Sequence, residues 1–300
     1  MLEKNLIKFI DKAAAIIQDD ALEADSLGFS ARVLVQASLP HRNPRDKQLT
    51  NGRWIKRNGN FALIMQQGCD IEGKDIGFPY GNIPRLILAY FSTQAVQTQN
   101  REISLGDSLS EFMSALGMYS NGRDIRRMKT QLHRLLSASI AFRYEDEDEK
   151  MVAGMNRPIA RKFFFWWDEK RPTQGTLFKN SVLLDEEFFE EIIKHPVPID
   201  MRAISVLKQS SLALDFYTWL TYRTFTLKSV QKIPWGSLHQ QVGSDYTRLR
   251  DFKKKSIEVL KKIYTIWPEL KIEETSDSLI IKPCKPHVSP LKISMLPRRD

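Results

Sequence analysis

The stretch NGRDIRRMKTQLHRLLSASI, residues 121–140, predicts a long amphipathic helix with a basic outer face. Apolar side chains recur at a spacing that gathers them on one side of an α-helix: Ile125, Met128, Leu132, Leu135 and Leu136. The opposite side, at about 100° per residue, carries polar and basic residues: Arg123, Arg126, Arg127, Thr130 and Arg134. One face therefore suits a hydrophobic core and the other an anionic partner. Many ordinary surface helices are also amphipathic, so this helix alone does not identify a function.

The composition describes a basic chain with enough apolar residues to fold. Of the 300 residues, 42% are apolar and 10% aromatic, which supports one large core or two of ordinary size. The formal charge of +9 suits a polyanion, either nucleic acid or an anionic membrane surface. Cys69 and Cys284 have neither zinc-site nor disulfide spacing, which favours a reducing, cytoplasmic setting. Charges interrupt the apolar positions of residues 1–20, so neither a signal peptide nor a membrane span is expected.

The order of predicted elements around residues 121–140 is that of a winged-helix domain. Helices are expected at 86–97 and at 105–116, the second ended by Gly117, and the 121–140 helix follows. Residues 139–144 and 162–167 are rich in aromatic and β-branched residues and predict two paired strands, separated by a long loop that begins with EDEDE at 145–149. A helix-turn-helix extended by a β-hairpin has this arrangement.

Upstream of that unit, the patterns are less regular. Residues 2–24 predict a helix that docks on the body or pairs with a second copy of the chain. Residues 32–36 and 53–65 are strand-like, with a tight turn expected at 57–60. Residues 68–84 hold too many glycines and prolines for regular structure, and Pro84 suits the first turn of the helix that follows.

The same order recurs downstream, which indicates an internal duplication. Helices are expected at 211–226, 234–241 and 245–263, and residues 270–282 are strand-like. A shift of 126 residues places Leu86 on Leu212 and Gly117 on Gly243, and after a loop two residues shorter the shift becomes 124. We therefore expect an α+β fold of two tandem winged-helix domains with an N-terminal helix. The expected divisions are 1–27, 28–195, 196–285 and a tail at 286–300.

Two basic helices of this design in one chain favour DNA binding over an ordinary solvated surface. In the first copy, arginines suit the major-groove edge of guanine, and residues near the start of the helix would reach the bases. In the second copy, lysines suit phosphates because each acts as a point charge. The candidate DNA-binding residues are Arg123, Arg126, Arg127, Lys129, Thr130, Arg134, Thr247, Arg248, Arg250, Lys253, Lys254 and Lys255.

Several patterns that could indicate catalysis or a cofactor have simpler explanations. The run GCDIEGKD at 68–75 resembles a phosphate-binding loop, but Asp75 replaces the hydroxyl residue and no helix is expected to follow. The acidic run at 145–149 suits a solvated hairpin tip better than a metal site, and the five histidines are scattered. The aromatic run at 163–167 could stack on single-stranded bases, although its alternation favours burial in a core. We therefore expect no catalytic residues, no cofactor and no metal.

Several blocks of the chain resemble the plasmid-encoded RepA replication initiators. They are FPYGNIPRLILAY at 78–90, REISLGDSLSEFM at 101–113, RVLVQASLPHRNP at 32–44 and RNGNFALIM at 57–65. The resemblance spans about residues 28–285. It implies two winged-helix domains that bind direct repeats (iterons) in double-stranded origin DNA. It also implies opening of the origin, contacts with the host initiator and replicative helicase, and a change between dimer and monomer.

Two other functions remain open at this stage. A winged-helix transcriptional regulator that never initiates replication would have the same sequence features. An enzyme that nicks DNA or hydrolyses nucleotide is the second alternative, which the absence of a legible catalytic grouping disfavours.

Overall fold

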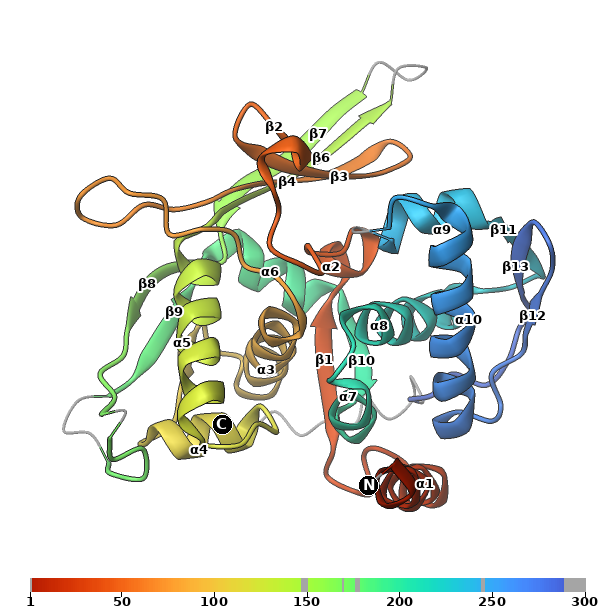
Figure 1. Ribbon diagram of the computed structural model, residues 1–300, viewed down its shortest axis with the longest axis horizontal. Coiled ribbons are helices and arrows are strands. Elements are labelled where there is room, and N and C mark those ends of the chain that lie inside the picture. The colour runs from red at the N-terminus through yellow and green to blue at the C-terminus, as the bar shows by residue number, and fades with distance from the viewer. Residues whose placement is uncertain (1, 147–150, 169, 176–178, 244–245, 289–300) are drawn as a thin grey trace.

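Strand β1 (Leu27–Ala31) pairs antiparallel with β10 (Pro196–Asp200) between two groups of helices (Figure 1). The computed structural model describes residues 2–146, 151–168, 170–175, 179–243 and 246–288. The pairing is buried along both strands, with Phe29 and Ile199 fully enclosed. Because β1 and β10 lie about 170 residues apart in sequence, this pair connects the early and late parts of the fold. The architecture is mixed α+β.

The first group surrounds the helix expected at residues 121–140. It contains α3 (Asn82–Thr98), β5 (Glu102–Ser104), α4 (Leu109–Ala115), α5 (Gly122–Ser137), β8 (Ala160–Phe164), β9 (Ser181–Leu184) and α6 (Glu186–Lys194). The strands form a sheet in the order β5-β9-β8. Helix α4 begins at Leu109 because the Ser108 hydroxyl accepts a hydrogen bond from the backbone N–H of Glu111. Gly117, at φ +64°, ends the turn that follows.

The second group repeats this order of elements as far as β9, without a described counterpart of α6. It contains α8 (Ser211–Thr226), β11 (Gln231–Pro234), α9 (Trp235–Val242), α10 (Leu249–Ile266), β12 (Ile272–Glu274) and β13 (Ser278–Ile281). Its strands form a sheet in the order β11-β13-β12, so in both groups the third strand lies between the first and the second. Figure 1 shows α5 and α10 on opposite flanks of the molecule, with α3 and α8 between them. The start expected for α10 at Asp245 lies outside the described residues.

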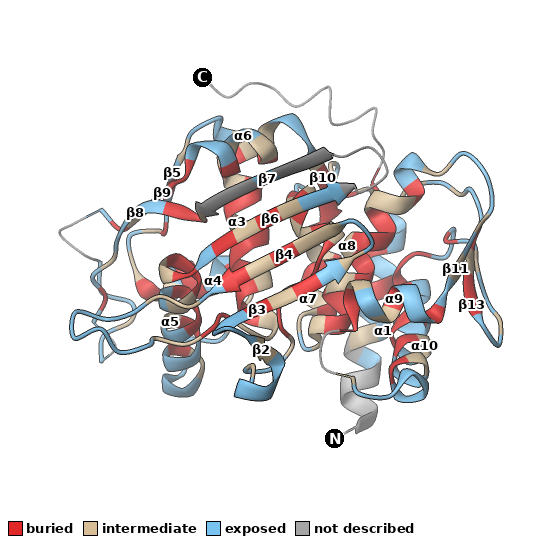
Figure 2. Ribbon diagram, turned by 90° about the horizontal axis from the view of Figure 1, so that it is seen from above, coloured by how far each residue is buried: buried red, intermediate tan, exposed pale blue. Residues whose placement is uncertain are grey.

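A five-stranded antiparallel sheet lies above the helices and belongs to neither group (Figures 1 and 2). Its order is β2-β3-β4-β6-β7, from β2 (Leu49–Thr50), β3 (Arg53–Asn58), β4 (Phe61–Gln66), β6 (Ser139–Asp146) and β7 (Met151–Pro158). The tight turn between β3 and β4 is confirmed, with Gly59 at φ +57°. Residues 147–149 of the acidic run lie outside the described residues.

The expected pairing of residues 139–144 with 162–167 is wrong. Strand β6 pairs with β4 and β7, whereas β8 pairs with β9. The long loop expected between β6 and β8 contains strand β7, in which Gly154 lies opposite Arg143 and a Cβ would lie 2.6 Å from the guanidinium. Strand β6 therefore forms a hairpin with β7, the next strand in the sequence.

The remaining helices include one further correction. They are α1 (Leu2–Gln18), α2 (Arg32–Gln36), the 3-10 helix η1 (Asp46–Gln48) and α7 (Met201–Leu207). Residues 32–36 form a short helix and not a strand, because this turn packs against both α6 and α8 and buries Val33 and Val35. Such two-sided burial imitates the alternation of a strand. Helix α1 ends at Gln18, earlier than expected, and packs against α7 and α10.

The aromatic run at 163–167 is only partly in the core. Trp167 is buried, but Phe163, Phe164 and Trp166 are exposed, so the expected burial of the run is wrong for these three side chains. Strand β8 lies at the edge of its described sheet, and its face toward α5 is only partly covered, since Phe163 contacts His133 but remains exposed.

Candidate nucleic-acid interface

Helix α5 has the two faces that its sequence predicts. The side-chain oxygen of Asn121 accepts a hydrogen bond from the backbone N–H of Asp124 at 3.0 Å and fixes the first turn. Ile125, Met128, Leu132, Leu135 and Leu136 are buried against the core, where α5 contacts α3. On the outer face, the exposed candidates are Arg123, Arg126, Arg127 and Thr130.

These four residues line a groove of about 640 Å³. Its other walls come from segments that are distant in sequence: His41 and Arg42, the start of α3 at Asn82, and Ser211 at the start of α8. Backbone N–H groups at helix starts attract anions, and the arginines add positive charge. The groove therefore combines positive charge with helix starts, and both favour an anionic ligand.

The arginines of this face make only weak local contacts. Arg126 Nε donates to the carbonyl of Gly122 at 3.2 Å, within its own helix. Arg127 lies 3.3 Å from a carboxylate oxygen of Asp124, with its side chain half-exposed. Exposed ion pairs of this kind contribute about 0–1 kcal/mol, so both side chains can exchange them for a phosphate or base at little cost.

Arg134 and Lys129 differ from these four, because both are only partly exposed. The Arg134 Nε donates to the carbonyl of Ile76 at 3.0 Å, and the guanidinium lies 5.4 Å from the centre of the Tyr80 ring. Arg134 therefore holds the 76–80 segment against α5. Lys129 lies on the flank of α5 that faces β8.

The basic side chains at the start of α10, the second basic helix, differ in their exposure and in their partners. The candidates Thr247, Arg248, Arg250 and Lys254 are exposed around the start of α10. Arg250 has 84% of its side chain exposed and lies 3.7 Å from Asp251. Lys255 is paired with Glu258 at 2.7 Å, which holds the pKa of the Glu258 carboxyl below its ordinary value through the hydrogen bond and charge of the lysine.

Lys253 is used inside the second unit. Its ammonium donates to the carbonyls of Thr275 and Ser276 at 2.9 and 2.8 Å and lies 5.6 Å from the centre of the Trp235 ring. These contacts attach the β12–β13 turn to α9 and α10. Lys253 therefore orders the turn in this structure, a role that helical periodicity could not predict.

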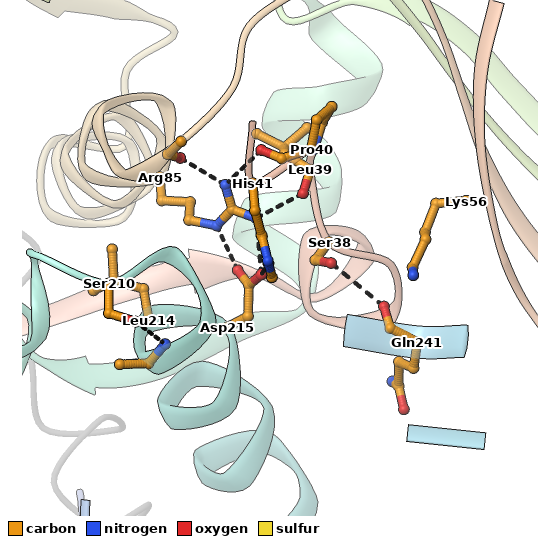
Figure 3. A network of polar contacts seen from close by, with 12 residues as sticks. Ser38, Leu39, Pro40, His41, Lys56, Arg85, Ser210, Leu214, Asp215 and Gln241 are labelled. Atoms are coloured by element: carbon orange, nitrogen blue, oxygen red, sulfur yellow. Dashed lines mark hydrogen bonds and ion pairs between the residues drawn. The ribbon is translucent and has the colours of Figure 1, made fainter. Parts of the chain in front are cut away.

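A buried charged cluster connects the two groups of helices beside the groove (Figure 3). Arg85 of α3 donates from Nε to Asp215 Oδ1 at 2.6 Å and from a terminal nitrogen to Oδ2 at 2.8 Å. His41 Nε2 lies 2.7 Å from the same carboxylate. Burial alone would raise the pKa of Asp215, but the charge of Arg85 and the hydrogen bonds from His41 and Arg85 outweigh it and lower that pKa.

The same cluster fixes the loop that lines the groove. Arg85 also donates to the carbonyls of Leu39, Pro40 and Gly81, so the 39–41 segment is held at α3. His41 and Arg42 are functional candidates that periodicity missed because they lie on this loop. Their block at 32–44 was recognisable only through its family resemblance.

In the part of the chain that the structure describes, no three His, Cys, Asp or Glu side chains gather in a way that could hold a metal ion. The 68–75 segment closes on itself through a bridge between Cys69 and Asp75 and leads into irregular chain up to α3. No described helix has the apolar length that a bilayer crossing requires.

Comparisons with known proteins identify the family. The chain is similar in fold to two crystal structures of domains 2 and 3 of RctB, at 12% and 11% identity and TM-scores of 0.50 and 0.51. Each comparison covers 85% of this chain and 96% or 98% of the RctB chain. No curated protein sequence matches. A family model described as plasmid encoded RepA protein matches residues 78–236, more than half of the chain. The chain belongs to the family of plasmid-encoded RepA replication initiators.

Proposed function

We propose that this protein initiates plasmid replication by binding iterons in double-stranded origin DNA through two winged-helix domains. The observation that carries the proposal is the exposed arginine face of α5 over a groove bounded by the starts of α3 and α8. Arg126 and Arg127 would enter a major groove, and the surrounding N–H groups and Arg42 would hold the phosphates. The protein would act by binding alone, without catalysis.

The repeated topology supports two winged-helix domains related by duplication. Each group runs helix, strand, helix, helix, strand, strand, and each sheet has its third strand in the middle. The division we propose is 28–195 and 196–285, with β1 and β10 joining the two across their boundary. The β6–β7 hairpin is an insertion between α5 and β8 that has no counterpart between α10 and β12.

If α5 and α10 both bind DNA, binding of one helix holds the other close to the same duplex, so the second contact forms within one complex. We expect α5 and α10 to occupy successive major grooves, about 34 Å apart on one face of the duplex. Avidity would then exceed the affinity of either domain alone. If 6–10 phosphates are neutralised, affinity should fall by about 10³- to 10⁵-fold between 50 and 200 mM salt.

Footprinting and gel shifts on the DNA that flanks the gene test the proposal. Protection over two turns of each repeat is expected, whereas protection over one turn would rule out docking by both domains. Arg126→Ala should weaken binding to the repeat more than to random DNA if Arg126 reads a base. Arg171→Ala is the matched control, since Arg171 is an exposed arginine outside the groove, paired with Asp168 at 3.3 Å.

A transcriptional regulator with the same fold would bind DNA but would not initiate replication. Transformation with a plasmid whose origin depends on this gene separates the two functions, because only an initiator maintains the plasmid. A nicking or nucleotide-hydrolysing enzyme would show activity with Mg²⁺ on supercoiled DNA or ATP. Activity that disappears with the groove arginines would overturn the non-catalytic proposal.

The partners implied by the family are the host initiator, the replicative helicase and a second copy of the chain. A homodimer has some physical support on α1, where Ile7, Ile10 and Ile17 are each more than half exposed along one side. Ile10→Glu should shift a dimer toward monomer in sedimentation experiments. An unchanged mass would remove α1 from consideration as the dimer contact.

A further inference from the structure

Strand β8 and the residues that follow it expose a row of aromatic side chains beside α5. Phe163 is 39% exposed, Phe164 49% and Trp166 59%. Successive side chains of a strand point to opposite faces, so Phe163 and Phe164 expose aromatic surface on both sides of this edge strand. Exposed aromatic surface of this kind commonly marks a binding site. The aromatic row lies outside the groove that the arginines of α5 line.

Phe163 is supported by a stack of rings that reaches the core. Phe163 stacks on Phe165 at 5.8 Å between ring centres, Phe165 on Trp167 at 5.2 Å, and Trp167 on Phe112 of α4 at 5.5 Å. The backbone N–H of Trp166 donates to the side chain of buried Asn180 at 2.8 Å. The Phe163 ring and the backbone at Trp166 are therefore held in place, which lowers the conformational entropy that binding would cost. We call the segment 163–167 the platform.

A hollow of about 490 Å³ separates this platform from α5. Phe163 and its neighbours form one wall, and Lys129, Thr130 and His133 form the other. The rings of His133 and Phe163 meet edge to face at 6.4 Å. A planar ligand could stack on Phe163 while polar groups of α5 contact its edge, and the volume lies in the range typical of small-molecule sites.

Positive charge accompanies the aromatic row. Arg161 and Lys162 precede Phe163 on β8 and are exposed, and Lys129 lies across the hollow. Aromatic rings for bases and cations for the backbone are the combination that single-stranded nucleic acid requires. Paired bases are stacked inside a duplex and cannot place their faces on Phe164 or Trp166. An apolar peptide would use the rings but would gain nothing from the cations.

We propose that β8 and this hollow bind unpaired DNA bases by stacking, next to the duplex-binding face of α5. The inference rests on the proposed function only for the source of the strand, which an opened origin would supply. Binding of a single strand at β8 would hold it away from its complement and thereby stabilise the opened region. The duplex-binding groove and the single-strand platform would share α5 as their common wall.

Fluorescence anisotropy with a fluorescein-labelled mixed-sequence single strand of 12 nucleotides tests the proposal on the full chain. Phe164→Ala with Trp166→Ala should weaken single-strand binding by about 5- to 150-fold per stacked base, with duplex binding to the flanking repeats unchanged. Trp166→Phe should retain most of the affinity because it keeps a stacking ring. Phe225→Ala is the matched control, since Phe225 is 50% exposed but lies at the end of α8.

Each outcome separates this inference from the proposed function. Unchanged single-strand affinity in the double variant overturns the platform, and the aromatic row would then serve a protein partner. An equal loss on duplex and single strand also overturns it, because β8 would then belong to the duplex interface. Arg126→Ala with Arg127→Ala should lower duplex binding and leave the single-strand affinity, so the failure of one proposal is distinguishable from the failure of the other.

Discussion

Arg85 and Asp215 join α3 and α8, the first helices of the two groups, through a buried bidentate ion pair. The two contacts are 2.6 and 2.8 Å long, and the side chains are only 9% and 10% exposed. Because Arg85 also binds the 39–41 segment, one guanidinium determines both how the groups meet and where the wall of the groove lies. The contact between the two proposed domains thus depends in part on buried side chains beside the groove, in addition to the pairing of β1 with β10.

Loss of this pair should destabilise the protein strongly. Arg85→Ala leaves Asp215 buried without its main cation, and breaking a buried pair from one side costs about 3–5 kcal/mol. Chemical denaturation should report that decrease in the free energy of unfolding. Arg171→Ala removes an exposed pair and should change it by less than about 1 kcal/mol. A similar small change for both variants would contradict the structural role of Arg85.

Arg134 should behave as a structural residue. Arg134→Ala frees the 76–80 segment, and the loss of charged hydrogen bonds predicts a stability decrease of about 1.5–3 kcal/mol. Arg134→Lys should restore it only in part, since lysine cannot reproduce the guanidinium stacking over Tyr80. Thermal unfolding measures both. If Arg134→Ala leaves stability intact and weakens only DNA binding, this assignment is wrong.

The neighbouring lysines of α10 should separate into two roles. Lys254→Ala is expected to leave stability unchanged and to lower the slope of log affinity against log salt by about one, as for a phosphate contact. Lys253→Ala should instead lower the melting temperature, because it releases the β12–β13 turn from α9 and α10. Salt titrations and melting curves of both variants check the assignment. Equal salt slopes in the two variants would count against it.

Gly77 should tolerate no side chain. It has φ +95°, and a Cβ there would lie 3.0 Å from the Arg134 guanidinium. Gly77→Ala is therefore expected to destabilise the fold by about 1 kcal/mol or more, through backbone strain and displacement of Arg134. Gly52→Ala is the control, since Gly52 also has positive φ but open space around its Cβ position. Equal losses would show that the contact with Arg134 contributes nothing.

His287 should make stability depend on pH. Burial lowers its pKa below the ordinary 6.5, and nearby Arg202 lowers it further, although Asp200, Glu269 and the carbonyl of Ile266 act in the opposite direction. As pH falls below about 6.5, the unfolded chain binds the proton before the folded one does. The free energy of unfolding should therefore decrease from pH 6.5 downward, until His287 is also protonated in the folded state.

Denaturation at several pH values measures this effect as a difference between variants. His287 Nε2 donates to the carbonyl of Ile266, so the neutral ring accepts at Nδ1 the 2.7 Å hydrogen bond of the Tyr217 hydroxyl. Protonation of Nδ1 prevents that nitrogen from accepting this bond. His287→Gln should be less stable near neutral pH but should show a smaller decrease below pH 6.5. Parallel curves for the two proteins would contradict the assignment.

The sequence by itself determined the local elements and their order. The periodicity of Ile125, Met128, Leu132, Leu135 and Leu136 fixed which face of α5 is buried, because one helix turn repeats every 3.6 residues whatever lies outside it. Helix α8 was likewise bounded correctly at Ser211 and Thr226. Hydrophobic periodicity did not predict the helix at residues 32–36, which is buried from two sides. It also did not predict β7, a strand that contains Gly154 and ends at Pro158.

Only the tertiary structure decided what each basic side chain does. Arg126 and Arg134 are both arginines of one helix, yet one lines the groove and the other holds a distant loop. Lys253 and Lys254 are adjacent, yet only Lys253 reaches the β12–β13 turn. The physical reason is that helical spacing sets the direction of a side chain, whereas its partner depends on segments brought close by the rest of the fold. The exposed platform on β8 has the same origin, because an alternating strand is buried only on the faces that the fold covers.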